Sequence, residues 1–241
     1  MSRYFNKSLL GLLFLAVICT SCTKPMSTQS TSLPSPAVDL PLELNSTWVY
    51  QATRYTGFNP SEIMTATHIV TETIVDLQIT STHLAAKVYR EESAEEPVYV
   101  PESMQNVSVY PANPSKYWLV FSDNHVYRQE GNLDLHGLYN TGTLEFVFPL
   151  QLGEKWYLTN AMAELNPDKR VDSMLRKVVQ VGTVTVPAGS FEDCFLLAEV
   201  IGGTTYEKWF CPGAGLVDQR SDHHGTPYGS REVLVRYDLG R

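Results

Sequence analysis

The stretch Phe191–Cys211 reads FEDCFLLAEVIGGTTYEKWFC, two strand-like runs on either side of Gly202-Gly203. A pair of glycines between two β-favouring runs is a strong signal for a hairpin with a two-residue turn. A two-residue turn also fixes which residues face each other across the hairpin, and here it places Cys194 opposite Cys211. The stretch therefore predicts an antiparallel hairpin, and with it a protein built from paired strands.

The same strand-like composition continues over most of the chain. The runs Thr65–Val75, Lys177–Val186 and Glu232–Tyr237 are dense in β-branched residues, which favour strands. Asp123-Asn124 separates two further runs of this kind and is typical of a two-residue turn. After residue 22, no run of ten or more residues holds the apolar spacing of three and four that an amphipathic helix needs. The fold class is therefore predicted as all-β and mainly antiparallel.

A ten-residue phrase occurs twice in the chain. Pro41–Tyr50 reads PLELNSTWVY, and Pro149–Leu158, which lies 108 residues later, reads PLQLGEKWYL. Asn45 and Gly153 stand at the position where a tight turn needs a positive φ, which these two residue types tolerate best. We interpret the phrase as the opening of two related halves that share one continuous sheet. A chance similarity of ten residues is the alternative.

The first 22 residues have the order of an export signal: Arg3 and Lys7, then the apolar run Leu9–Ile18, then CTSC, which ends at Cys22. An apolar run of about 10 residues is too short to span a bilayer, which takes roughly 20. The order resembles the bacterial lipoprotein signal, in which the cysteine at the cleavage site is acylated, for example with palmitate. We therefore predict a lipoprotein signal peptide over residues 1–22 with lipidation at Cys22. Secretion without a lipid is the alternative.

Residues 23–39 are rich in serine, threonine and proline and have too little apolar content to fold, so we predict a tether. Removal of the signal takes away two basic side chains and no acid, which leaves 16 basic against 26 acidic side chains and a formal charge of −10. An acidic body disfavours binding to nucleic acid or to anionic lipid through charge. The membrane is therefore reached through the acyl anchor at Cys22, on the non-cytoplasmic side of the cell envelope.

The remaining part of the chain, residues 40–241, is long enough for a substantial apolar core. No stretch of linker-like composition divides it. We predict a single β-rich domain with two pseudo-halves, 40–148 and 149–241.

The hairpin register predicts a disulfide between Cys194 and Cys211. The two cysteines fall on a non-hydrogen-bonded pair, in which the Cα atoms lie about 4.5 Å apart, and this separation suits a disulfide. An exported protein meets the oxidising conditions in which such a pair forms. Two reduced, buried cysteines are the alternative. A redox role is disfavoured because the pair lacks the C-x-x-C spacing that lowers a thiol pKa.

Two motifs flank the hairpin and carry a family resemblance. Val184–Cys194 reads VTVPAGSFEDC, and Trp209–Val217 reads WFCPGAGLV. The P-A-G-S-F and P-G-x-G-L-V motifs, together with the phrase at Pro149, resemble a family of exported bacterial β-sheet proteins of unknown function, many of them lipoproteins. The resemblance implies a large curved sheet or half-barrel that is open on one side. It brings no catalytic residues with it.

No catalytic, metal or cofactor site is predicted. Asp222-His223-His224 has the residue types of a metal site, but neighbouring residues on a strand point to opposite faces, so we interpret it as a polar loop tip. Glu91-Glu92 and Glu95-Glu96 are interpreted as a solvated loop and not as a pair of catalytic carboxylates. The chain also has no G-x-S-x-G nucleophile motif.

Three functions are compatible with this sequence. We expect a non-enzymatic, membrane-tethered binding or scaffold module of the cell envelope, with an envelope protein as its partner. The alternative is a carrier of an apolar or lipid-like ligand in the concave face of the sheet, and an envelope hydrolase comes third. A concave face filled by the protein's own side chains would exclude the carrier. A hydrolase would need a hydrogen-bonded nucleophile and base in an open cleft.

Overall fold

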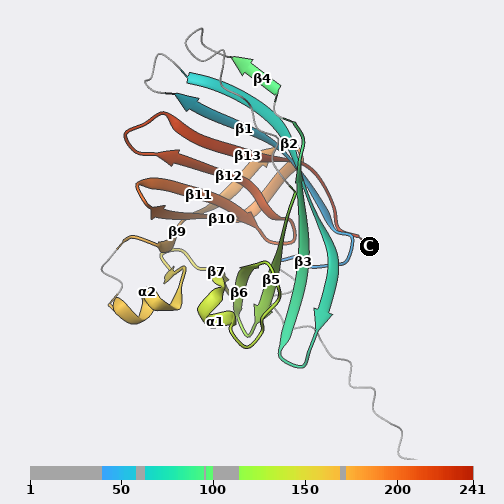
Figure 1. The fold of residues 1–241 in the computed structure, drawn as a ribbon, viewed down its shortest axis with the longest axis vertical. Helices are drawn as coiled ribbons and strands as arrows, with labels where there is room; N and C mark the ends of the chain where they lie inside the picture. Colours follow the sequence, from blue (N-terminus) through green and yellow to red (C-terminus); the bar gives the residue numbers. More distant parts are fainter. Residues whose placement is uncertain (1–39, 58–62, 95, 100–113, 169–171, 241) are drawn as a thin grey trace, which may run out of the picture. The chain divides into compact units, whose positions relative to one another are not determined.

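The computed structural model describes residues 40–57, 63–94, 96–99, 114–168 and 172–240. The predicted signal peptide, the lipidation residue Cys22 and the tether lie outside the described residues. Within the described part, thirteen strands form one antiparallel sheet, which confirms the all-β prediction (Figure 1). The elements in chain order are β1 (Thr47–Gly57), β2 (Ile63–Ile79), β3 (His83–Glu92), β4 (Glu96–Tyr99), β5 (Ser115–Ser122), β6 (His125–Glu130), α1 (Leu138–Thr141), β7 (Thr143–Val147), β8 (Lys155–Tyr157), α2 (Asn160–Leu165), β9 (Leu175–Val186), β10 (Gly189–Ile201), β11 (Thr204–Cys211), β12 (Gly215–His223) and β13 (Tyr228–Asp238).

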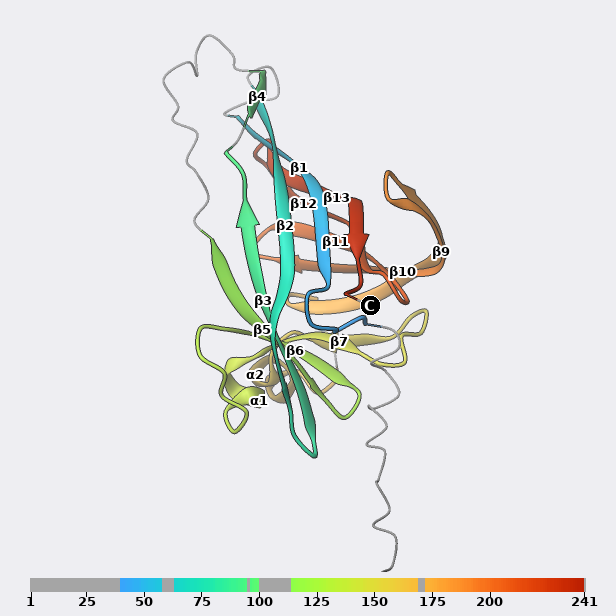
Figure 2. The ribbon, with the colours of Figure 1, turned by 90° about the vertical axis from the view of Figure 1, so that its right-hand side faces the viewer.

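The sheet is a long meander in which most strands pair with their neighbours in the chain. The order is β7-β6-β5-β3-β2-β1-β13-β12-β11-β10-β9-β8, and β4 pairs with β2 beside this path. The sheet twists so far that β9 and β10 run across the direction of β1 and β2 (Figure 2). Its two ends come together, because the Leu144 amide of β7 donates to the Leu158 carbonyl just after β8 at 2.8 Å. The predicted large curved sheet is confirmed, and it nearly closes on itself.

The β10–β11 hairpin has the predicted two-residue turn and register. Gly202 and Gly203 have φ angles of 56° and 80°, the positive pair that a type I′ turn requires. Leu196 faces Trp209 across the hairpin. The Cα atoms of Cys194 and Cys211 lie 4.2 Å apart and their sulfur atoms 2.05 Å apart, so the two cysteines stand at disulfide distance.

Oxidation of this pair is open to a direct measurement. The purified, unfolded protein is expected to resist alkylation at Cys194 and Cys211 until it is reduced, as read by the peptide masses. Because the bond closes a loop over a sequence separation of 17 residues, its loss in Cys194→Ser should lower the free energy of unfolding by about 3 kcal/mol. Alkylation of either cysteine without prior reduction would show that the pair is reduced.

The repeated phrase forms the same turn in both places. Asn45 and Gly153 have φ angles of 67° and 84°, so the predicted positive φ is confirmed at both positions. Each donates its amide to a carbonyl of a nearby strand, Asn45 to Ile74 and Gly153 to Val178, both at 2.9 Å. The single domain and its division into two related halves stay predictions.

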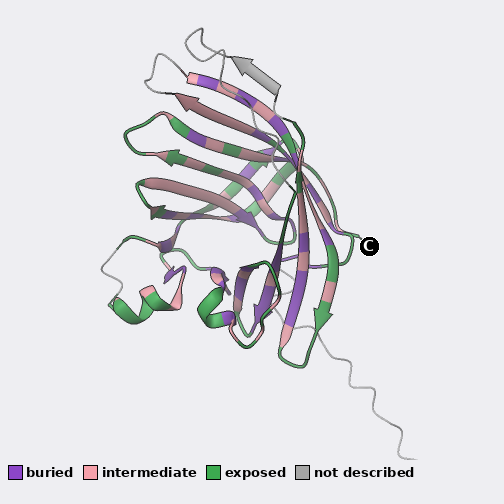
Figure 3. Ribbon diagram, viewed as in Figure 1, coloured by how far each residue is buried: buried purple, intermediate pink, exposed green. Residues whose placement is uncertain are grey.

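The core follows the two-residue period of the strands. Figure 3 shows it as buried positions that alternate with intermediate or exposed ones. In β2, Val70 and Ile74 are fully buried, whereas Ile69 and Val75 on the other face are more than two-fifths exposed. Across the curve, Phe146 of β7 packs against Phe210 of β11 with ring centroids 4.9 Å apart. Strands on opposite sides of the curve therefore pack against each other and bury much of the concave face. The two short helices lie together at one end of it, next to β6 and β8 (Figure 1).

Candidate functional site

The curved sheet encloses a cavity of about 410 Å³. Its lining comes from β1–β3, from β5–β7 and from β11–β13, and strands so far apart in the sheet order meet only on the concave side. One part of the lining is apolar and the other is charged. The apolar part includes Leu40, Leu42, Trp48, Ile74, Val88 and Phe146, and the charged part includes Glu72, Arg90, Arg128, Glu145, Lys208 and Glu232.

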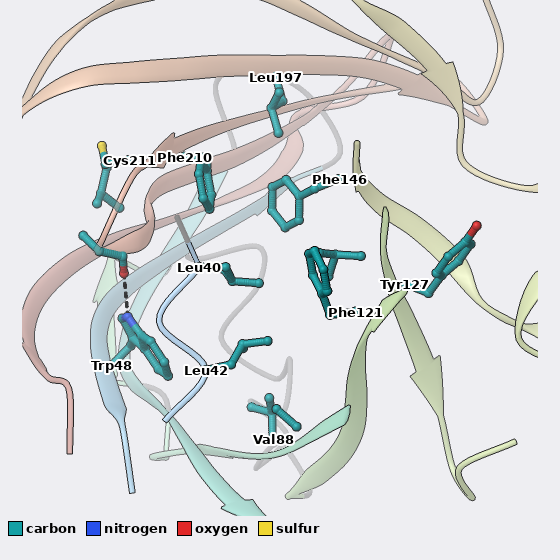
Figure 4. Packing of buried hydrophobic residues seen from close by; sticks show 14 of the residues in the cluster. Leu40, Leu42, Trp48, Val88, Phe121, Tyr127, Phe146, Leu197, Phe210 and Cys211 are labelled. Carbon is teal, nitrogen blue, oxygen red and sulfur yellow. Dashed lines mark hydrogen bonds between the residues drawn. The ribbon is translucent and has the colours of Figure 1, made fainter. Parts of the chain in front are cut away.

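The floor of the cavity is formed by the segment that precedes β1. Leu40 and Leu42 point into the enclosed space between Trp48 and Phe146 (Figure 4), and they are 6% and 7% exposed. The Trp48 indole donates to the Ala214 carbonyl at 2.7 Å and thereby holds the ring against this segment. The protein's own side chains thus fill part of the concave face, and the cavity is the part that they leave open.

One charged wall of the cavity is organised around Arg90 of β3. Its guanidinium binds three carboxylates: Glu72 at 2.9 Å, Glu92 at 2.9 Å and Glu232 at 2.5 Å. Glu232 also accepts a hydrogen bond from Gln219 at 2.9 Å. All three acids therefore have charged donors within the protein.

Two tyrosines lie next to this wall. Burial raises the pKa of Tyr50 and of Tyr117 well above the ordinary value, and the charge of Glu72 raises both further. Both phenols therefore stay protonated at neutral pH. The Tyr50 hydroxyl donates to the Leu216 carbonyl at 3.2 Å.

The opposite charged wall is organised around Glu145 of β7. Its carboxylate accepts from Arg176 Nη1 at 2.8 Å and from Lys208 Nζ at 3.3 Å. Arg176 is 1% exposed and also holds Glu199 of β10, with Nη2 at 2.7 Å. Burial by itself would raise the pKa of Glu145, but Lys208, Arg176 and Arg128 outweigh it and hold that pKa well below the usual range. This wall is therefore a carboxylate surrounded by three cations.

The Arg176 cluster also lies where the two ends of the sheet meet. Arg176 belongs to β9, and its Nη1 donates to the backbone carbonyl of Glu145 in β7 at 2.6 Å. The Trp156 indole of β8 donates to the Leu144 carbonyl in β7 at 3.2 Å. Side chains therefore join β7 to β8 and β9, beside the backbone bond from the Leu144 amide to the Leu158 carbonyl.

The residues that the sequence singled out do not form this cavity. Cys22 lies outside the described residues. Cys194 and Cys211 are fully buried on β10 and β11 but do not line the cavity. The cysteine pair therefore belongs to the framework of the sheet, and both its oxidation and the lipidation at Cys22 stay predictions.

The histidines lie on separate elements. His125 begins β6, His136 precedes α1, and His223 ends β12, where its Nδ1 lies 2.8 Å from Thr226 Oγ1. His224 Nε2 lies 2.7 Å from Thr205 Oγ1. In the described part of the chain, no group of three or more His, Cys, Asp or Glu side chains is placed to hold a metal ion.

The interpretation of Glu91-Glu92 as a solvated loop was wrong for Glu92. Glu92 is the last residue of β3, and its side chain is 11% exposed and bound to Arg54 at 2.6 Å as well as to Arg90. The two-residue period carried a signal for this position, because Val88, Arg90 and Glu92 share one face of a strand. Applied to β3, that period places both charged residues on the same face as a buried valine.

Comparison with protein-family models and with curated proteins found no match. Two crystal structures have a similar chain path. One, from Bacteroides fragilis, is described as an exported protein with a YmcC-like fold; its TM-score is 0.45 at 11% identity, over 81% of this chain and 96% of that chain. The other, from Parabacteroides distasonis, is described as a lipoprotein; its TM-score is 0.44 at 11% identity, over 82% and 97%. Within the described residues, no helix is long and apolar enough to cross a membrane.

Proposed function

We propose that this chain is a lipid-anchored, non-enzymatic binding protein of the cell envelope, and that the cavity in its sheet holds the apolar part of a small ligand. The observation that carries the proposal is the cavity itself, about 410 Å³ with an apolar floor and ion-paired walls. Small-molecule sites in proteins have volumes of about 300–1,000 Å³, with mostly apolar linings and a few polar groups. The cavity matches that description in its volume and its apolar floor, and its charged walls supply more polar groups than usual.

The chemistry of the walls favours binding over catalysis. Glu72 and Glu232 are held by Arg90, and Glu145 is held by Arg176 and Lys208. A carboxylate that is bound to a cation is a weak base, and a tyrosine with a raised pKa is a weak nucleophile. These lining groups therefore suit a rigid, desolvated binding cavity.

The driving force for binding is the removal of apolar surface from water, at about 25 cal/mol for each Å². The floor residues, among them Leu40 and Leu42, are already held in place by the fold, so a ligand would not have to order them. A preformed site that needs little reorganisation binds an apolar ligand at a lower entropic cost.

The proposal can be tested with N-phenyl-1-naphthylamine, a neutral probe that fluoresces in apolar surroundings. The full mature chain, residues 22–241 with Cys22→Ser to avoid detergent, is expected to bind this probe saturably. Leu119→Trp should weaken probe binding, because Leu119 lines the cavity and the larger ring would occupy part of the space that the probe needs. Val75→Trp is the matched control, because Val75 is 46% exposed on the outer face of β2.

Circular dichroism would confirm that both variants fold. Probe binding that is absent from the parent chain, or that is equally strong in Leu119→Trp and Val75→Trp, would contradict the proposed function.

A further inference from the structure

We propose that the ligand of this cavity is an amphiphile with an anionic head, a carboxylate or a phosphate, which Arg128 and Lys208 bind while its tail lies on the apolar floor. This inference rests on the proposed function and names the ligand class for the same cavity. It rests on the N–H donors of the charged walls that have no acceptor among the described residues.

Each acid of the cavity is already paired with a cation of the protein. Glu72 and Glu232 accept from Arg90 at 2.9 Å and 2.5 Å, and Glu232 accepts from Gln219 as well. Glu145 accepts from Arg176 and from Lys208. A cationic head would have to share these carboxylates with cations that repel it and that the protein holds in fixed positions.

The cations of the wall around Glu145 have hydrogen-bond donors to spare. Lys208 carries three ammonium donors, and in the described part of the chain one of them is used, for Glu145 at 3.3 Å. Arg128 carries five N–H donors; its Nε donates to Glu130 at 2.8 Å, and its two terminal nitrogens have no acceptor among the described residues. Both side chains line the cavity. Their spare donors match the oxygen atoms of a carboxylate or a phosphate.

Arg128 is held in place for this role. Its guanidinium lies 3.9 Å from the ring centroid of Tyr117, which also lines the cavity. Stacking fixes the plane of the guanidinium and leaves its edge, with the terminal N–H groups, open to an acceptor. The site is therefore ordered before a ligand arrives.

The surroundings point the same way. Lys208, Arg176 and Arg128 together hold the pKa of Glu145 well below its usual range. Arg176 is also paired with Glu199, and Arg128 with Glu130, so it is the spare donors of Lys208 and Arg128 that would receive an anion. The chain as a whole has a formal charge of −8, so most of its surface repels an anion, which favours these donors over non-specific binding.

The test is displacement of N-phenyl-1-naphthylamine from the same full mature chain by amphiphiles of one tail length, each below its micelle concentration. Dodecanoate and dodecyl phosphate are expected to displace the probe at concentrations at least about ten-fold lower than dodecanol or dodecyltrimethylammonium. Inorganic phosphate, which has the head but no tail, is expected not to displace it.

Variants locate the head group. In the double variant Arg128→Gln, Lys208→Gln, dodecanoate and dodecanol should displace the probe at about equal concentrations. Arg220→Gln is the matched control. Arg220 also lines the cavity, but its guanidinium is bound to Glu207 at 2.5 Å and its side chain is 55% exposed. The control should keep the full preference.

The outcomes separate this inference from the proposed function. If dodecanol displaces the probe as well as dodecanoate does, or if the double variant keeps the preference, the anionic assignment is overturned while the cavity remains a binding site. If inorganic phosphate is as effective as dodecyl phosphate, the site is for a free anion and the amphiphile is overturned. If no probe binds saturably, both proposals fail together.

Discussion

Replacement of Arg176 by methionine is expected to lower the free energy of unfolding by about 3–5 kcal/mol, the range for breaking a buried ion pair. Arg176 is 1% exposed and binds Glu145 and Glu199, whose side chains are 11% and 2% exposed. Methionine fills much of the volume but donates no hydrogen bond. Glu199 then loses the cation with which it is paired. The Glu145 carboxylate loses one of its two side-chain donors and keeps the other, Lys208. Denaturant unfolding followed by circular dichroism measures the loss.

The matched control for this variant is the next residue along the strand. Lys177 pairs with Asp172 at 2.7 Å, but the two side chains are 38% and 71% exposed. Exposed pairs contribute about 0–1 kcal/mol, so Lys177→Met should change stability by no more than that. A loss below about 1 kcal/mol in Arg176→Met, or equal losses in the two variants, would show that the cluster does not hold the ends of the sheet together.

Replacement of Cys22 by serine is expected to move the protein from the membrane fraction to the soluble fraction. The acyl chains that we propose at Cys22 hold the protein through about 0.8 kcal/mol for each buried methylene, and a serine cannot carry a thioether-linked lipid. Cell fractionation with mass spectrometry of the N-terminal peptide measures both the location and the modification.

Cys19 provides the control for this variant. It lies three residues earlier, inside the predicted signal peptide, so Cys19→Ser should leave the protein in the membrane fraction. If Cys22→Ser stays in the membrane fraction while its signal is still removed, the anchor is something other than an acyl group on this cysteine.

The features that depend on local backbone chemistry could be predicted from the sequence. Gly202-Gly203 forms the two-residue turn that its position between two strand-like runs indicates, and the register of the hairpin follows from the turn. Asn45 and Gly153 adopt the positive φ that their place in the repeated phrase predicts. In each case the residue type and its near neighbours decide the conformation, so no knowledge of the rest of the fold is needed.

The charged walls of the cavity could not be predicted, although one part of their pattern is visible. The two-residue period places Arg90 on the same face of β3 as Val88, but it does not say what the arginine meets there. Its partner Glu232 lies 142 residues away in the chain. A period on a single strand therefore identifies a face, and only the pairing of distant strands shows that the face holds a salt-bridge network.

Short-range sequence patterns are enough to show that this protein is built from antiparallel strands, where its turns fall, and which two cysteines stand opposite each other, because these properties follow from contacts between residues close in the chain. The tertiary structure alone decided that the sheet curls far enough to enclose a cavity. It also decided that Lys208 meets Glu145 across 63 residues of chain, and that Leu40 and Leu42 form the floor. Curvature is a sum of small twists over many strands, so no single stretch of sequence records where the two walls will meet.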